Sequence, residues 1–160
     1  MNRRHLLLGA MAAVSGPALL AGSAQAFFMG SSQYRLAALE AGEFAIATSQ
    51  IALATSRSPR IRRFAEAEIA EQMNIAAQLG GRPGEVRLRP DHVAMIEQLQ
   101  AASPRSFDAL YVRGQTMGHQ ELYTINTAYA AGADAREQSV AAAGLPLIQR
   151  HLSVLARLRA

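Results

Sequence analysis

This 160-residue sequence predicts an all-α fold, an antiparallel four-helix bundle. Three observations support the prediction. Alanine is abundant, β-branched residues are sparse, and no stretch alternates apolar and polar residues with the period of two that a half-buried strand shows. Apolar residues instead recur at spacings of three and four, which places them on one face of a helix. Proline and glycine stand mainly between these periodic stretches, where helices begin and end.

The first 26 residues are expected to be a secretory signal peptide. They contain an arginine pair and an apolar run, and they end in "AQA", the small-x-small pattern after which signal peptidase cuts. The pair resembles a twin-arginine export signal, although general export signals carry such pairs too. The apolar run is interrupted by "SGP" and falls short of the roughly 20 apolar residues that a membrane span needs. We therefore expect the export machinery to deliver a domain of residues 27–160 to the periplasm, with association with the outer membrane left open.

The composition excludes several kinds of site. The chain has no cysteine, so any metal must be held by histidine, carboxylate or water. The formal charge of +4 falls to +2 once the two arginines of the signal peptide are removed. A domain so close to neutral lacks the concentrated basic face of nucleic-acid-binding proteins. We therefore expect no nucleic-acid partner.

The first two helices are predicted on either side of a short turn. The first runs from Gln33 to about Ser56. The second begins at Pro59, because Ser58 is a favoured N-cap residue and proline is favoured at the first helical position, and it ends at the glycine pair 80–81. The expected inner stripe of the first helix comprises Ala37, Phe44, Ile51 and Ala54.

The connection to the next long helix is long. The stretch "GRPGEVRLRP" is predicted to be a loop, and Asp91 is expected to cap a short extra helix that ends near Ala102. His92 follows this cap and is expected to be exposed. A bundle with one long crossover, here between its second and third long helices, has the ferritin-like arrangement. That is the fold we predict.

The last two helices each carry a histidine on the inner face. The third is predicted from about Pro104 to Ala131. The fourth is predicted to follow Asp134 as its cap and to run to near Leu158, with a kink at Pro146. The expected inner positions of the third helix are Asp108, Tyr111, Gln115, His119, Leu122, Asn126 and Tyr129. Those of the fourth are Gly144, Leu147, His151, Val154 and Leu158. Both histidines should therefore face one core.

Four stretches resemble one known family. They are "ALEAGEF", "SPRIRRFAEAEIAEQMNIAAQL", "FDALYVRGQTMGHQEL" and "AAAGLPLIQRHLSVL". Together they resemble the bacterial exported, ferritin-like proteins called domain of unknown function 4142, over nearly all of residues 27–160. The resemblance implies a four-helix bundle and an envelope location, and the family has no generally established activity.

The sequence departs from this family's pattern at positions that bear on metal binding. Glu71 and Gln72 stand where the family usually has an aspartate–histidine pair, and an amide is a poor metal ligand. Gly118 replaces an acid that often precedes the third-helix histidine, whereas His119 and His151 are kept. A ferritin-like di-iron centre also needs Glu-x-x-His motifs, and the chain contains none. We therefore expect no di-iron oxygen chemistry.

Two interpretations of the histidines stay open. The favoured one is a polar pair in the core, because buried polar groups need hydrogen-bond partners. The predicted supporting residues of this polar core are Gln72, Tyr111 and Asp108. The other interpretation is a single divalent ion, such as zinc, iron or manganese, held by His119, His151 and Glu71, with Glu68 as the alternative carboxylate. A shared ion requires the two ring systems to bring nitrogens within about 5 Å of each other.

The predicted function is a non-enzymatic binding or envelope stress-associated module, with a mononuclear metal-binding protein as the alternative. No catalytic residue is assigned, because the chain has no nucleophile elbow, phosphate loop or paired-carboxylate spacing. An envelope protein or a second copy of this chain is left open as a partner.

Overall fold

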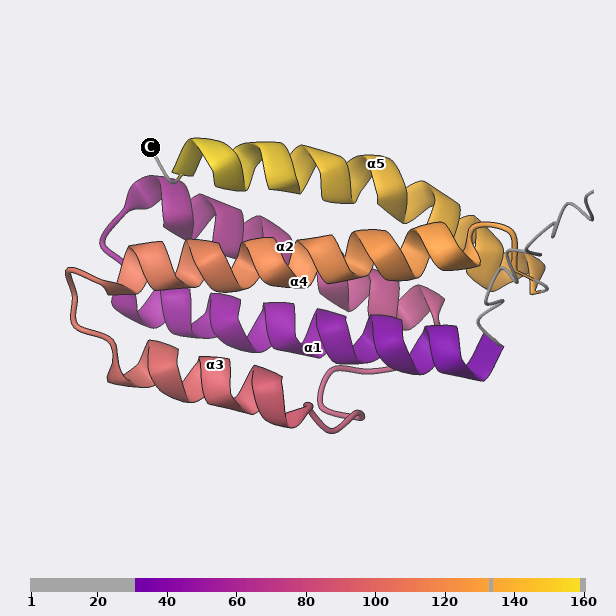
Figure 1. The fold of residues 1–160 in the computed structure, drawn as a ribbon, viewed down its shortest axis with the longest axis horizontal. Coiled ribbons are helices and arrows are strands. Elements are labelled where there is room, and N and C mark those ends of the chain that lie inside the picture. Colours follow the sequence, from indigo (N-terminus) through magenta and orange to yellow (C-terminus); the bar gives the residue numbers. More distant parts are fainter. Residues whose placement is uncertain (1–30, 133, 159–160) are drawn as a thin grey trace, which may run out of the picture.

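The computed structural model describes residues 31–132 and 134–158, and these form five α-helices and no strand (Figure 1). The helices are α1 (Ser31–Thr55), α2 (Pro59–Gln78), α3 (Pro90–Ala101), α4 (Phe107–Tyr129) and α5 (Ala135–Leu158). The predicted all-α class is therefore confirmed over the described residues. The predicted signal peptide lies outside them.

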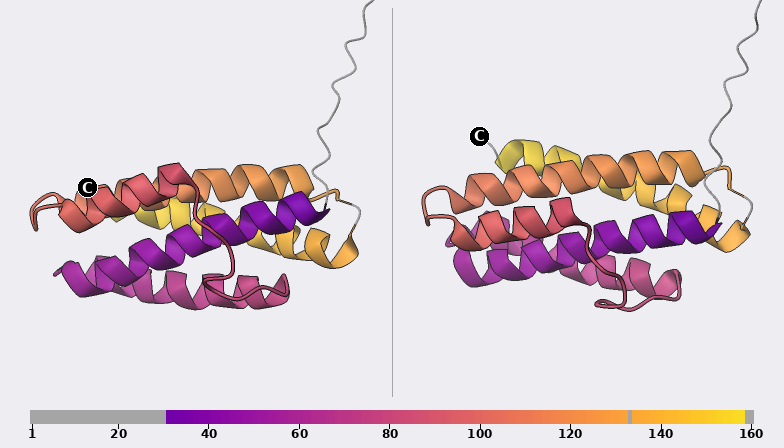
Figure 2. Two further views of the ribbon diagram at one scale, coloured as in Figure 1. Left: turned by 90° about the horizontal axis from the view of Figure 1, so that it is seen from below. Right: turned by 60° about the horizontal axis from the view of Figure 1, so that its bottom comes forward.

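The four long helices α1, α2, α4 and α5 lie lengthwise side by side, and the short helix α3 packs on the outside along α1 and α4 (Figures 1 and 2). Helices α2 and α4 run in one direction, and α1 and α5 run in the other (Figure 1). Helix α1 packs closely on α2 and α4, and α4 packs closely on α5. Contacts between α2 and α5 are much sparser, so this side is the loosest part of the packing.

Most helix ends follow local sequence signals, with two exceptions. The predicted start of the third long helix at Pro104 is wrong, because the Ser103 carbonyl accepts from the Ser106 amide in a turn and α4 begins only at Phe107. The Ser58 hydroxyl accepts a hydrogen bond from the Ile61 amide, with Pro59 at the first helical position of α2. Gly80 adopts a φ of 70° just after α2, a conformation that glycine tolerates best. Asp91 does not cap α3, contrary to the prediction. The helix begins one residue earlier because Pro90 takes the first helical position, which places Asp91 inside the first turn.

Two apolar clusters occupy the two ends of the core, and a polar layer and a smaller apolar cluster of Ala41, Leu122 and Ile148 lie between them. One cluster includes Phe64, Phe107 and Leu155, and the other includes Tyr34 and Tyr129. The buried polar residues between them along α2, α4 and α5 include Glu68, Gln72, Gln115, His119 and His151. Polar side chains in this position need partners of their own, because they are largely removed from solvent.

The predicted inner stripes are correct for α4 and partly wrong for α1 and α5. Six of the seven positions expected in α4 are buried, and Asp108 is half-buried. Ala54 of α1 is exposed. In α5 the buried residues are Ala141, Gly144, Ile148, His151 and Leu155. Leu147, Val154 and Leu158 are only half-buried. Two neighbouring apolar stripes run along α5, and the position of α4 beside it selects which one becomes core.

Helix α1 is the most apolar of the helices. By length and hydropathy alone its segment Ser32–Thr55 would also suit a membrane span, but 56% of its most apolar window is buried inside the protein. The core helix of a globular domain has the same composition, so the composition of α1 alone does not distinguish a membrane span from a core helix.

Candidate metal centre

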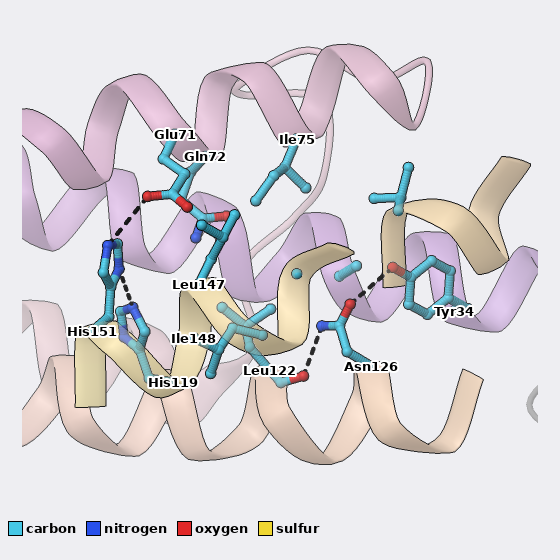
Figure 3. Close-up of a pocket in the computed structure, with 13 residues that line it drawn as sticks. Tyr34, Glu71, Gln72, Ile75, His119, Leu122, Asn126, Leu147, Ile148 and His151 are labelled. Atoms are coloured by element: carbon cyan, nitrogen blue, oxygen red, sulfur yellow. Dashed lines mark hydrogen bonds and ion pairs between the residues drawn. The ribbon is translucent and has the colours of Figure 1, made fainter. Parts of the chain in front are cut away.

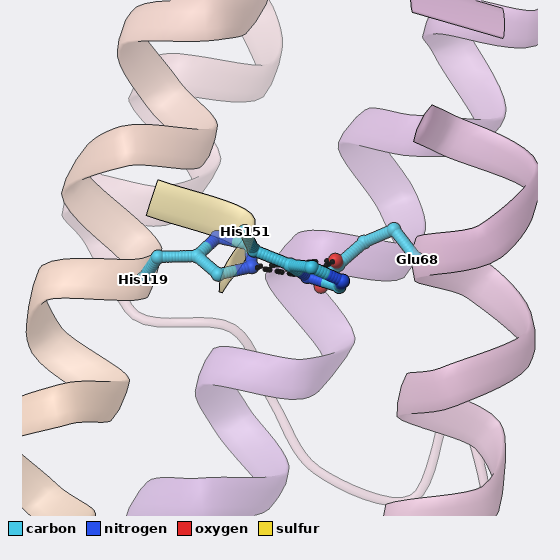
Figure 4. A group of neighbouring side chains, drawn as sticks. All are labelled: Glu68, His119 and His151. Carbon is cyan, nitrogen blue, oxygen red and sulfur yellow. Dashed lines mark hydrogen bonds and ion pairs between the residues drawn. The ribbon is translucent and has the colours of Figure 1, made fainter. Parts of the chain in front are cut away.

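Three buried side chains from three helices converge in the polar layer: Glu68 from α2, His119 from α4 and His151 from α5 (Figure 4). Their exposed fractions are 0%, 1% and 9%. Each lies on the inner face of its helix because buried apolar residues stand three or four positions away on the same helix. Phe64 lies four residues before Glu68, and Leu155 lies four residues after His151.

The three facing atoms form a nearly equilateral triangle. The Glu68 Oε2 atom lies 2.9 Å from His151 Nδ1 and 3.3 Å from His119 Nε2, and the two ring nitrogens are 3.1 Å apart. Adjacent ligands of an ion with bonds of about 2.0–2.1 Å are separated by about 2.9 Å in octahedral and about 3.4 Å in tetrahedral geometry. The triangle therefore has the dimensions of one face of a coordination sphere.

The outer nitrogen of each histidine is held by an acceptor. His119 Nδ1 lies 2.8 Å from the carbonyl oxygen of Gln115, which can only accept a hydrogen bond. His151 Nε2 lies 3.2 Å from Glu71 Oε2 (Figure 3). A proton on each outer nitrogen leaves the inner nitrogen of a neutral ring with a lone pair directed at the triangle. Outer acceptors of this kind orient most metal-binding histidines.

The Glu68 carboxylate is held in a similar way. The Gln72 amide donates a 2.9 Å hydrogen bond to Oε1, which leaves Oε2 to face the histidines. Despite its short contacts, Oε2 has no partner with hydrogen-bond geometry among the described residues. A carboxylate oxygen and two ring nitrogens that all carry lone pairs repel one another, so the triangle needs a positive charge from a proton or a metal ion.

The ionisation of the site reflects this requirement. Burial by itself raises the pKa of Glu68, but contacts with His119 and His151 outweigh it and lower the pKa to about 2. Burial likewise lowers the pKa of His151, and its contacts with Glu68 and Glu71 outweigh that effect and raise the pKa to about 9. In the absence of metal, a proton on His151 therefore supplies the positive charge at neutral pH.

A small cavity adjoins the triangle on the side of Leu122 and Asn126 (Figure 3). Its volume is about 30 Å³, which is enough for one or two water molecules. It is lined by His119 and His151 at one end and by Tyr34 at the other, where the tyrosine hydroxyl donates to Asn126 Oδ1. A water in this cavity has polar partners beside the histidines.

The structure brings some of the predicted site residues together and separates others. His119 and His151 meet within the 5 Å that a shared ion requires. Glu71 contacts only the outer nitrogen of His151. Tyr111 pairs with the hydroxyl of Ser49 at 2.9 Å, and Asp108 lies in the first turn of α4, three turns from His119. Of the predicted supporting residues, Gln72 alone bonds directly to a member of the triangle.

The sequence analysis placed Glu68 second to Glu71 as the carboxylate ligand, although the burial pattern of α2 favours Glu68. It belongs to the stripe of Ile61, Phe64, Ala65, Gln72 and Ala76, all of them buried. A carboxylate at the centre of such a stripe must be buried, and buried carboxylates require partners. Glu71 stands three residues later, at the edge of this face, and is half-buried.

His92 corrects another prediction. It is 5% exposed rather than on the surface, because α3 lies against α1. The His92 ring stacks on the ring of Phe44, with centroids 4.4 Å apart. The Nε2 atom faces Arg89 at 2.9 Å. Burial and the charge of Arg89 lower the pKa of His92, which favours a neutral ring. Its partners are Arg89, Glu121 and Phe44, and none of them belongs to the triangle.

Comparison with known proteins identifies the family. The model of the family described as "Domain of unknown function (DUF4142)" matches residues 14–158, and the chain belongs to that family. No curated protein and no solved structure matches the chain.

Proposed function

For this member of the family, we propose that the protein binds one divalent transition-metal ion between Glu68, His119 and His151 as an exported, ferritin-like four-helix bundle. The observation that carries the proposal is the triangle of three buried ligand atoms, 2.9–3.3 Å apart, whose residues are each held from outside by another partner. Two imidazoles and one carboxylate suit zinc, or ferrous iron and manganese with added water.

The arrangement of the helices supports the ferritin-like part of the proposal. Helices α2 and α4 run in the same direction, and residues 79–106 connect them along the length of the protein with α3 on the way (Figure 2). A long crossover between two helix pairs is the feature that distinguishes ferritin-like bundles from simple up-and-down bundles. The proposed site nevertheless differs from a di-iron centre, because it offers one carboxylate and two imidazoles rather than two Glu-x-x-His motifs.

The proposed role is binding rather than catalysis. The cavity beside the triangle holds about 30 Å³, which suits a water ligand but is far below the 300–1,000 Å³ typical of small-molecule sites. The protein would therefore retain an ion in the envelope without turning over an organic substrate.

A proton-bridged histidine pair is the competing interpretation. The 3.1 Å contact between the ring nitrogens fits a shared proton as well as it fits a shared metal ion. The two differ in what metal does to stability. A ligand that binds only the folded state stabilises it by about 2.7 kcal/mol when present at 100 times its Kd. A purely structural pair gives no such gain.

Thermal unfolding of the metal-stripped protein, with and without zinc, manganese and ferrous iron, tests the proposal. We expect one of these ions to raise the melting temperature by several degrees, with one ion bound per chain by calorimetric titration. No rise with any of the three ions would overturn the metal proposal and leave the histidines as a structural pair.

Export is tested separately. We expect the protein recovered from the periplasmic fraction to begin at Phe27, as amino-terminal sequencing would reveal. Recovery of the uncut chain from the cytoplasm would contradict the proposed location without affecting the metal site.

A further inference from the structure

The side on which α2 and α5 pack loosely contains a surface groove of about 430 Å³. Its charged lining comes from two arginines on each helix, Arg60 and Arg63 on α2 and Arg150 and Arg157 on α5. Its apolar lining includes Phe64, Val154 and Leu158. The volume lies within the range of small-molecule sites.

Among the described residues, no acidic side chain compensates the positive charge of this groove. No acidic residue lines it, and within residues 31–132 and 134–158 none of the four arginines takes part in an ion pair. Arg60 donates to the carbonyl oxygen of Arg157 at 2.9 Å, which holds it at the end of the groove. Four guanidinium groups around one hollow, none of them ion-paired within the described part of the chain, attract an anion.

The spacing of the arginines indicates the size of that anion. Arg60 and Arg63 are three residues apart on α2, and Arg150 and Arg157 are seven residues apart on α5, which at 1.5 Å per residue extends the charge over about 10 Å. This is longer than a single phosphate. Guanidinium groups bind phosphate oxygens through paired hydrogen bonds, so an anion with two or more linked phosphate groups would engage arginines from both helices.

We propose that the groove between α2 and α5 binds a small, soluble molecule carrying two or more linked phosphate groups, such as a short polyphosphate or an ester of pyrophosphate. The apolar floor formed by Phe64, Val154 and Leu158 would contact the organic part of an ester. His151 lines both this groove and the inner cavity, so the bound anion lies on the outer side of the proposed metal centre. Binding of the anion does not depend on metal, because the arginines contact neither Glu68 nor His119.

Calorimetric titration of the metal-stripped protein with pyrophosphate at an ionic strength of about 0.1 M, where the Debye length is about 10 Å, tests the proposal. The double variant Arg63→Gln, Arg150→Gln removes one arginine from each wall. We expect it to weaken pyrophosphate binding about tenfold or more, since each charge-assisted bond is roughly twice as strong as a neutral one. The double variant Arg113→Gln, Arg136→Gln is the matched control, because both residues are exposed on other parts of the surface; it should change the affinity less than about twofold, since it removes the same net charge away from the groove.

In the titrations, the proposal would be overturned by no saturable binding at millimolar pyrophosphate, by equal weakening in the two double variants, or by tighter binding of citrate than of pyrophosphate. Binding only to vesicles containing phosphatidylglycerol would show a lipid surface as the occupant and would also overturn it. The variant His119→Gln separates this inference from the proposed function, because it should lose metal binding and keep pyrophosphate binding.

Discussion

The Nε2 atom of His119 lies 3.1 Å from the Nδ1 atom of His151, although each ring has an acceptor for its proton on the opposite side. The outer acceptors are the Gln115 carbonyl and the Glu71 carboxylate. Two neutral rings held in this way direct lone pairs at each other and at Glu68. The close approach is stable only when a cation lies between them, and a proton and a metal ion compete for that place.

Replacing His119 by glutamine should abolish the rise in melting temperature that metal produces in the unmodified protein. The substitution removes one of the two imidazole ligands and leaves the volume of the site nearly unchanged. Without metal, we expect a loss of about 1–3 kcal/mol in the free energy of unfolding, because His151 and Glu68 lose a buried partner. Thermal unfolding with and without zinc measures both effects.

The control for this experiment is His92→Gln. His92 is also buried, but it stacks on Phe44 and lies outside the triangle. This variant should lose stability and keep the full response to metal. A lost response in both variants would mean that the ion binds elsewhere or that the effect is unspecific.

Substitutions at Glu68 and Glu71 distinguish a metal ligand from an outer acceptor. Glu68→Gln should remove zinc binding, because it takes away the only carboxylate oxygen in the triangle. Glu71→Gln should weaken zinc binding by about 10–100-fold, as expected for a group that orients a histidine from outside. Calorimetric titration with zinc gives both affinities. The reverse order of effects would establish Glu71 as the ligand and refute the assignment of Glu68.

Substitutions in α5 test which apolar stripe forms the core. Leu155 is completely buried, so Leu155→Ala should cost about 2–5 kcal/mol in the free energy of unfolding. The neighbouring Val154 is half-buried, and Val154→Ala should cost about 1 kcal/mol or less. Chemical denaturation measures the difference. Equal losses would place α5 in a different rotation from the one described.

Stability at high pH should depend on Tyr34. Burial, together with the charges of Glu137 and Tyr129, raises the pKa of its hydroxyl from 10.0 to about 12. Between these two values the unfolded chain releases the proton and the folded chain keeps it, so the free energy of unfolding falls as pH rises, by about 1.4 kcal/mol per pH unit. The contribution is complete below pH 10 and is lost by about pH 12.

The variant Tyr34→Phe should be less stable at neutral pH by about 1 kcal/mol, since it loses the hydrogen bond to Asn126. Its stability should also fall less steeply between pH 10 and 12, as urea unfolding at several pH values would measure. Tyr123→Phe, at an exposed position, is the control. An unchanged slope in Tyr34→Phe would contradict the role of this hydroxyl.

The sequence alone determined the helical class, most helix boundaries and the burial of His119 and His151. These properties are local, because helix periodicity and the Ser58-Pro59 start signal act over a few residues. The family could also be predicted, because several short motifs typical of it occur in the same chain. The inner face of α4 was read correctly for the same reason, with Tyr111 and Leu122 on one stripe.

Only the tertiary structure decided which groups meet. Periodicity places several apolar and polar residues near the core, but the rotation of each helix against its neighbours selects among them. That selection made Leu155 rather than Val154 part of the core and brought Glu68 rather than Glu71 into contact with both histidines. It also buried His92 of α3 against Phe44 of α1. Such contacts join residues far apart in the chain, and their energies depend on packing that no local pattern contains.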